Sequence, residues 1–299
     1  MYKQISSNRW KSSLLIGVFI GVLSLAGYAY GMVTESGYTG VTMAFTISVG
    51  MTLFSWFLGD KVVLATSGAR EILQREENPY LWNLIENLAI TAGIPRPRLY
   101  VVDDPSPNAF ATGRDPAHAS VAVTTGIVSL LENEELEGVI AHELSHIKNR
   151  DTRLMMLAAV LVGAITLLGD FFLHGSLFGR RRSSDREGGG LIMILGIIFL
   201  ILSPIIGQLI QLAISRRREY LADASGALLT RYPEGLARAL EKIHQANIPL
   251  ERASQATAHL WIADPSAPGG IRRRLQGLFS THPPIEERIQ ELYRMTGAR

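Results

Sequence analysis

The sequence has no cysteine among its 299 residues. That absence excludes disulfide bonds, thiolate catalysis and metal sites with cysteine ligands, so any metal ion must be held by histidine, aspartate or glutamate. The chain also lacks a strong charge of either sign, because 29 Lys and Arg residues stand against 27 Asp and Glu residues. This balance excludes nucleic acid as an expected partner, since the basic residues lie among nearly as many acids.

Charge is missing altogether from two long stretches near the N-terminus. The first lies between Lys11 and Glu35, and the second lies between Glu35 and Asp60. Each is long enough to cross a hydrocarbon core of roughly 30 Å as a helix. Residues 1–60 are therefore predicted to form a transmembrane hairpin. A cleaved signal peptide is the alternative for the first stretch, and the second stretch that follows at once argues against it.

The basic residues around this hairpin predict its orientation. The loop between the two stretches has no Lys or Arg, whereas bases precede the first stretch and follow the second: Lys3, Arg9, Lys11, Lys61, Arg70 and Arg75. Because basic flanks stay in the cytoplasm, both ends of the hairpin are expected there. The lipid bilayer, in bacteria the inner membrane, is thus an expected partner.

Two further apolar segments, residues 154–175 and 191–214, predict a second hairpin. It either spans the bilayer or packs shallowly at the cytoplasmic face. In both cases the chain returns at Arg216 to the side that it left at Arg153. Residues 154–214 therefore separate two polar regions on the same side, residues 61–153 and 215–299, and the later one is predicted to be mostly helical.

The first polar region has a mixed pattern of helices and strands. Proline positions and apolar periodicity predict helices over Gly68–Glu76 and Tyr80–Ala92 and strands over Leu99–Val102 and Ser120–Thr124. A short helix is predicted to follow the second strand. A longer helix is predicted to begin at Asn133, whose side chain can cap its N-terminus.

This last helix carries an H-E-x-x-H motif, His142-Glu143-Leu144-Ser145-His146. Two histidines four residues apart lie on one helical face and can bind one metal ion. Glu143 is then placed to hold a water molecule and take its proton as that water attacks a carbonyl. The alternative is an amphipathic helix whose histidines point at solvent.

A catalytic zinc ion needs a third protein ligand and an open fourth position. Because the chain returns beside the motif at Arg216, Glu219 is the first carboxylate available. Asp223, one turn later, can accept a hydrogen bond from the outer N–H of a ligand histidine. A surface ion pair between Glu219 and the preceding arginines is the alternative. The residues thus predict one Zn²⁺ per chain.

Three segments, AHELSHIKNRD, RREYLADASGA and FSTHPPIEERI, resemble the HtpX group of bacterial membrane metallopeptidases, whose wider family includes the CAAX prenyl proteases. The resemblance extends over nearly the whole chain. It implies a predominantly α-helical integral membrane protein with a zincin-like (gluzincin) α+β metallopeptidase domain. It also implies zinc ligands His142, His146 and Glu219, with Glu143 as the base and Asp223 as support. The two polar regions would then form the catalytic part.

Other roles rest on the resemblance alone. It implies that His282 and Arg288 stabilise the oxyanion of the reaction, and that Asn108, Ala109 and Phe110 form an edge along which an extended polypeptide is laid. It further implies cleavage of misfolded or damaged membrane proteins at the cytoplasmic face. A narrow-specificity processing protease of the CAAX type, and an inactive scaffold that keeps its metal, are the alternatives.

Overall fold

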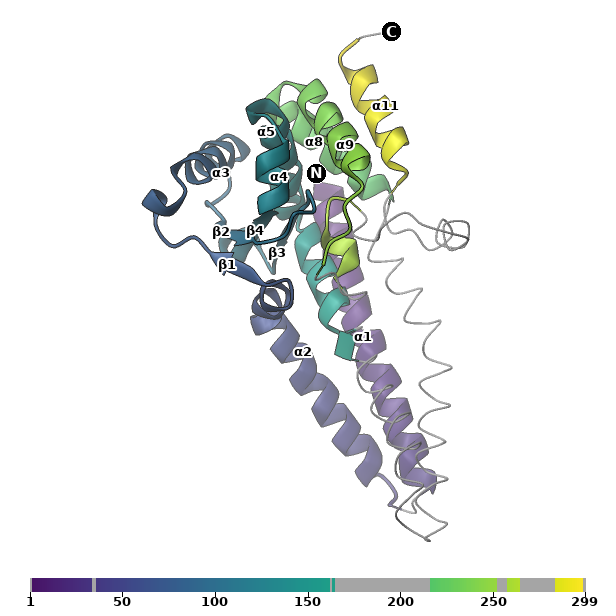
Figure 1. The fold of residues 1–299 in the computed structure, drawn as a ribbon. Helices are drawn as coiled ribbons and strands as arrows, with labels where there is room; N and C mark the ends of the chain where they lie inside the picture. The colour runs from purple at the N-terminus through teal and green to yellow at the C-terminus, as the bar shows by residue number, and fades with distance from the viewer. Residues whose placement is uncertain are drawn as a thin grey trace.

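The computed structural model describes residues 2–33, 36–161, 163–164, 216–251, 257–263 and 283–297. Within them, a long helical hairpin carries a folded part at one end (Figure 1). Most of the predicted second hairpin, residues 154–214, lies outside the described residues. The prediction that it spans the bilayer or packs shallowly concerns those residues. Its described beginning, up to residue 161, belongs to a helix that starts at residue 151.

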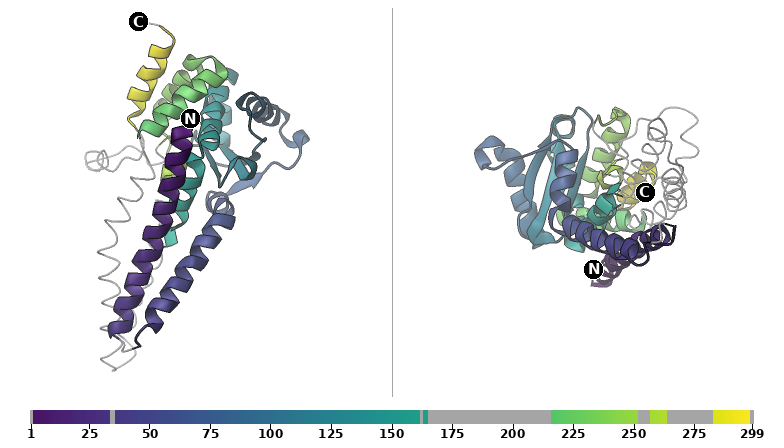
Figure 2. Two further views of the ribbon diagram at one scale, coloured as in Figure 1. Left: turned by 180° about the vertical axis from the view of Figure 1, so that it is seen from behind. Right: turned by 90° about the horizontal axis from the view of Figure 1, so that it is seen from below.

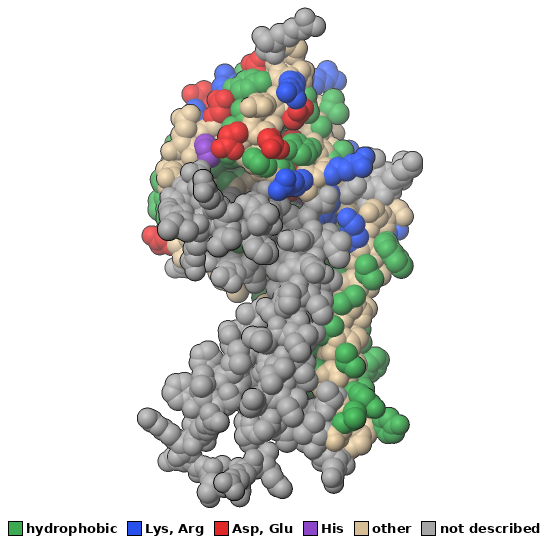
Figure 3. Space-filling model, turned by 90° about the vertical axis from the view of Figure 1, so that its right-hand side faces the viewer, with side chains coloured by type: hydrophobic (Ala, Val, Ile, Leu, Met, Phe, Trp, Pro, Cys, Tyr) green, Lys and Arg blue, Asp and Glu red, His purple; other side chains and the backbone are tan. Residues whose placement is uncertain are grey.

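The hairpin consists of α1 (Tyr2–Val33) and α2 (Thr39–Thr66). The two helices meet closely near its tip, where a Cβ atom on Gly27 would lie only 2.5 Å from the carbonyl oxygen of Gly40. Both are long and apolar enough to cross a membrane, and only 33% and 17% of their most apolar stretches are buried in the protein. Exposed hydrophobic side chains line this hairpin, whereas acidic and basic side chains gather over the folded part (Figure 3). Such a surface fits lipid rather than water.

The folded part is built on a four-stranded sheet in the order β1-β2-β4-β3. Strands β2 and β4 are parallel, and β1 and β3 pair antiparallel to them at the two edges. The strands are β1 (Ala69–Glu71), β2 (Arg98–Val102), β3 (Ala109–Gly113) and β4 (Ala119–Thr124). Both strands expected from the sequence are present, whereas a helix over Gly68–Glu76 is not. Gly68 has a positive φ of 68°, which ends α2 and turns the next residues into the edge strand β1.

Helices of the folded part lie on one face of this sheet, and α1, α2 and residues 154–161 lie on the other. The helices of the folded part are α3 (Pro79–Ala92), α4 (Thr125–Leu130), α5 (Asn133–Asn149), α8 (Arg216–Thr230), α9 (Pro233–Ala246) and α11 (Ile285–Met295). Short 3₁₀ turns lie at Arg75–Glu77, Pro116–His118 and Ala258–Leu260. Alternate strand residues such as Leu99 and Val121 face a core formed with α3, α5 and α9. Their neighbours Tyr100 and Ala122 face a second core formed with α1, α2 and residues 154–161. The sheet therefore joins the hairpin to the helices that carry the site.

The beginning of α1 lies against the folded part. Seen from behind, α1 runs up beside that part, and the N-terminus ends among its helices (Figure 2). Asn8 and Ser12, near this end, are each only 1% exposed.

Candidate metal centre

Helix α5 presents its histidines inward. Its N-cap is Glu132, which exchanges hydrogen bonds with Glu135 in a capping box, so Asn133 is the first helical residue rather than the cap. His142 and His146 are 1% and 3% exposed. This burial excludes the alternative in which the histidines point at solvent.

Helix α8 supplies the carboxylates because it can approach α5 closely. Gly226 makes this approach possible, since a Cβ atom there would lie 3.0 Å from the backbone nitrogen of His142. Glu219 and Asp223 stand seven and three residues before Gly226, on the same helical face. Both are buried, at 4% and 2% exposure, which excludes a surface ion pair for Glu219.

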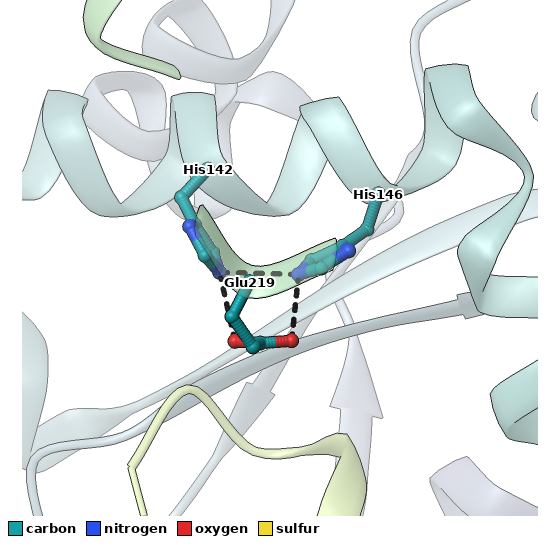
Figure 4. A group of neighbouring side chains, drawn as sticks. All are labelled: His142, His146 and Glu219. Carbon is teal, nitrogen blue, oxygen red and sulfur yellow. Dashed lines mark hydrogen bonds and ion pairs between the residues drawn. The ribbon is translucent and has the colours of Figure 1, made fainter. Parts of the chain in front are cut away.

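The two imidazoles and the Glu219 carboxylate converge on one point (Figure 4). The Nε2 atoms of His142 and His146 are 3.1 Å apart. The Glu219 oxygens lie 3.8 Å from the first of these atoms and 3.6 Å from the second. Among the described residues, this trio is the group of three whose donor atoms lie within 4.8 Å of one another.

The outer nitrogens show which lone pairs face this point. The Nδ1 atom of His142 lies 2.8 Å from Asp223 Oδ1, and that of His146 lies 3.1 Å from Asp151 Oδ2. Each Nδ1 must carry a proton to donate to a carboxylate, which leaves both Nε2 lone pairs directed at each other and at Glu219. Two nitrogen lone pairs and a carboxylate that face one another away from solvent repel unless a cation lies between them. Two nitrogen ligands at about 2.05 Å from a tetrahedral zinc ion would be roughly 3.3 Å apart, so the residues fit that ion.

The pKa values of the two histidines also indicate that a positive charge is favoured between them. Burial acts to lower the pKa of His146, but the hydrogen bond to Asp151 and the charge of Glu219 outweigh it and raise the pKa to about 9. Without metal, a proton therefore takes the place of the cation. Burial lowers the pKa of His142, which keeps that ring neutral.

Glu143 lies next to the trio on α5 and is 2% exposed. Burial raises the pKa of its carboxyl group to about 7, while the charge of His146 and a hydrogen bond from the backbone N–H of Ala111 oppose the shift. A carboxyl group with a pKa near neutrality can both accept and return a proton.

Arg288 is buried behind the trio. Its Nε and Nη2 atoms donate to the two oxygens of Asp223 at 2.9 and 2.7 Å, and Nη1 donates to the carbonyl of Ile262 at 3.0 Å. Nη1 also lies 3.8 Å from Glu219 Oε2. The charge of Arg288 outweighs the effect of burial and lowers the pKa of Asp223. His282, the other residue expected to stabilise an oxyanion, lies outside the described residues.

The expected substrate-binding residues lie at the start of the edge strand β3, with Asn108 just before it and Ala109 and Phe110 as its first two residues. Its edge is partly covered by residues 261–263, because Ile262 N donates to the Ala109 carbonyl at 2.9 Å. The side chain of Asn108 donates to the Ala263 carbonyl at 3.1 Å. Phe110 is fully buried, and its ring contacts that of Trp261 at 4.6 Å between centroids.

Asp151 is a part of the site that sequence reasoning missed. It is fully buried and lies just beyond the end of α5, where Arg150 adopts a left-handed conformation with φ of 59°. A carboxylate five residues after the second histidine was the available signal. Only the turn at Arg150 brings it back toward the imidazole.

Fold and site together define a membrane-associated metallopeptidase, in which two histidines and one glutamate could hold a metal ion. Residues 75–296 match the peptidase family M48. The chain is 46% identical to a "Protease HtpX homolog" of Dictyoglomus turgidum over 298 residues, which cover 100% of this chain and 95% of the relative. A protein of the same name from Tropheryma whipplei is 44% identical over 295 residues, with 99% and 98% covered.

The chain therefore belongs to peptidase family M48, and within that family it is of the HtpX type. A solved structure agrees at the level of the fold. The crystal structure of Ste24p from S. mikatae matches with a TM-score of 0.52 at 20% identity, covering 98% of this chain and 67% of the other.

Proposed function

We propose that this chain is a zinc-dependent endopeptidase that cleaves misfolded or damaged membrane proteins at the cytoplasmic face of the bacterial inner membrane. The observation that carries the proposal is the convergence of three buried lone-pair donors, His142, His146 and Glu219, beside the buried carboxyl group of Glu143. A zinc ion held there would supply Lewis acidity toward a peptide carbonyl and a water molecule.

The chain's own residues supply the proton transfers. Glu143 takes the proton from the attacking water and delivers it to the leaving amine, which its pKa near 7 permits in both directions. The N–H of Ala111, in β3, holds this carboxylate. Arg288 fixes Asp223, and Asp223 fixes the ring of His142, so that its Nε2 lone pair stays directed at the metal position. We infer that Arg288 acts by orienting the His142 ring through Asp223. A second role, stabilising the oxyanion together with His282, is also proposed for it.

The edge of β3 is proposed to receive the substrate. An extended polypeptide would pair with Asn108, Ala109 and Phe110, next to the residue that holds Glu143. Ile262 and Ala263 already bond to Asn108 and Ala109, so substrate pairing at these residues requires residues 261–263 to leave the edge.

The location of the site supports a membrane substrate. One end of the α1–α2 hairpin packs against the sheet that contains β3. The metal position therefore lies near that end of the hairpin, which is the end flanked by basic residues. By the positive-inside tendency that end is cytoplasmic. The catalytic part would combine residues 61–153 with residues 215–299, and exposed loops of damaged membrane proteins reach such a position without leaving the bilayer.

A cleavage assay tests the proposal. The full chain is purified in detergent with a chelator, zinc is returned, and casein cleavage is followed for wild type and for Glu143→Gln. The variant should bind one zinc ion per chain and lose activity by a factor on the order of 10² to 10⁴. Glu134→Gln, an exposed substitution on the same helix, is the matched control and should remain active.

Two results bear on separate parts of the proposal. Equal cleavage by Glu143→Gln and wild type would sink the catalytic role of Glu143. For the substrate class, a membrane protein reconstituted with the enzyme should be cleaved after a destabilising substitution in it and spared when fully folded. Cleavage of both forms at one rate would contradict a quality-control role.

A further inference from the structure

The first turns of α1 are linked to the metal site by a chain of hydrogen bonds. Asn8, which belongs to this mostly apolar helix, is 1% exposed. Its Nδ2 atom lies 2.5 Å from Asp151 Oδ1 and 3.0 Å from the carbonyl oxygen of Asn149. One amide group of the membrane helix thus contacts the last residue of α5 and the second residue beyond it.

Asp151 passes this contact on to a metal-binding residue. Its other oxygen, Oδ2, lies 3.1 Å from Nδ1 of His146. Because Asp151 is fully buried, both of its oxygens depend on protein donors for their hydrogen bonds. Arg218 Nη1 also approaches Oδ1, but at 4.0 Å it contributes charge rather than a hydrogen bond.

The position of Asn8 explains why a polar side chain is buried there. The turn at Arg150 has a left-handed backbone, and Asp151 must be held after it in one orientation to face His146. Asn8 bonds to both sides of this turn. A leucine, which has the same branching at Cγ, could pack there without holding the carboxylate, so packing alone does not account for asparagine.

We propose that Asn8 is a positioning residue of the metal centre, and that docking of the N-terminal membrane helix and binding of the metal ion strengthen each other. Asn8 acts through Asp151, which sets the ring of His146. The proposal rests on the proposed function in one respect, that His146 binds zinc. By reciprocity, whatever factor α1 docking adds to zinc affinity, zinc adds to the docking of α1. The membrane anchor is then part of the catalytic apparatus and not only a tether.

The test measures zinc affinity of the full chain in detergent by competition with a chelator. Removal of a direct partner of a metal ligand typically lowers affinity by about 10 to 100-fold, so Asn8→Ala, one bond further out, should lower it by about 3 to 10-fold. Ser12→Ala is the matched control. It lies one turn later on α1, is equally buried, and its hydroxyl donates to the carbonyl of Asn8 itself. It should stay within about twofold of wild type, because that bond lies within α1.

A double-mutant cycle separates positioning from a general effect on stability. Asp151→Ala should lower zinc affinity by more than Asn8→Ala does, and adding Asn8→Ala to it should have no further effect, because the path runs through Asp151. With cobalt in place of zinc, the visible absorption of Asn8→Ala should also change, and that of Ser12→Ala should not. Additive losses in the double variant would overturn the proposal.

Hydrogen exchange of the wild-type chain covers the case in which the variants fail to fold. Zinc should slow exchange of the backbone amides around Asn8, and exchange there unaffected by zinc would contradict the proposed link. The two proposals also fail differently. A wild-type chain that binds no zinc refutes the proposed function, whereas a zinc-binding wild type matched in affinity by Asn8→Ala refutes only the role of Asn8.

Discussion

Gly226→Ala should separate the geometry of the metal site from the stability of the fold. The added Cβ atom would lie 3.0 Å from the backbone nitrogen of His142, 3.2 Å from its Cα atom and 3.3 Å from the carbonyl carbon of Ala141. These are backbone atoms within α5 and cannot rotate aside. Helix α8 must therefore retreat by roughly half an ångström to regain ordinary van der Waals contact.

Two opposing effects decide the change in stability. In a helix interior, alanine is more favourable than glycine by about 0.8–1 kcal/mol of folding free energy. Overpacking against a fixed neighbour costs about 1–3 kcal/mol, so the free energy of unfolding should fall by roughly 0–2 kcal/mol. Zinc binding should suffer more distinctly, because ligand distances tolerate only about 0.2 Å of change. Glu219 and Asp223 move with α8, and we expect zinc affinity to fall by about tenfold, or ~1.4 kcal/mol.

Gly138→Ala is the matched control for this experiment. Its Cβ atom would lie 2.7 Å from the backbone nitrogen of Leu236, which strains the contact between α5 and α9 and not that between α5 and α8. Thermal unfolding and chelator competition are measured for both variants. Gly138→Ala should lose at least as much stability and keep zinc affinity within about threefold of wild type. Unchanged zinc affinity in Gly226→Ala, or an equal loss in both variants, would refute the reasoning.

Three further predictions concern the support of the site and the edge of the sheet. Asp223→Asn should lower zinc affinity by about 10 to 100-fold in chelator competition, because the ring of His142 loses a charged acceptor; a change under twofold would contradict this. Because the pKa of His146 is raised to about 9 without metal, its ring is protonated below that pH, and zinc binding at pH 7.5 should release about one proton, detected with an indicator dye in weak buffer. Trp261→Ala should lower the free energy of unfolding by about 3–5 kcal/mol in thermal or denaturant unfolding, since this side chain is 1% exposed against β3. A loss below about 1 kcal/mol would mean that residues 261–263 do not stay on that edge.

Local patterns were sufficient for the elements that the sequence predicted well. The strands around Leu99 and Val121 have dense β-branched and apolar residues, and α3 begins with Pro79, a residue type that suits the first position of a helix. The trio of His142, His146 and Glu219 followed from helical spacing and from the return of the chain to the same side. The structure brings these three together.

The remaining features depend on contacts between distant residues. β1 has only three residues, and its pairing with β2, which lies about 30 residues later, creates it. A helical reading of Gly68–Glu76 was wrong because tertiary pairing overrides local preference in so short a segment. The roles of Asp151 and Asn8 could not be predicted from the sequence for a similar reason. They are 143 residues apart, and no spacing rule connects a membrane helix to the end of α5.

Anomalous X-ray diffraction at the zinc absorption edge, from crystals of the full chain grown with zinc, tests the central claim most directly. The account predicts one strong anomalous peak per chain, about 2.0–2.2 Å from Nε2 of His142, Nε2 of His146 and a carboxylate oxygen of Glu219. A peak elsewhere, or none at these three side chains in a chain that cleaves casein, would contradict it.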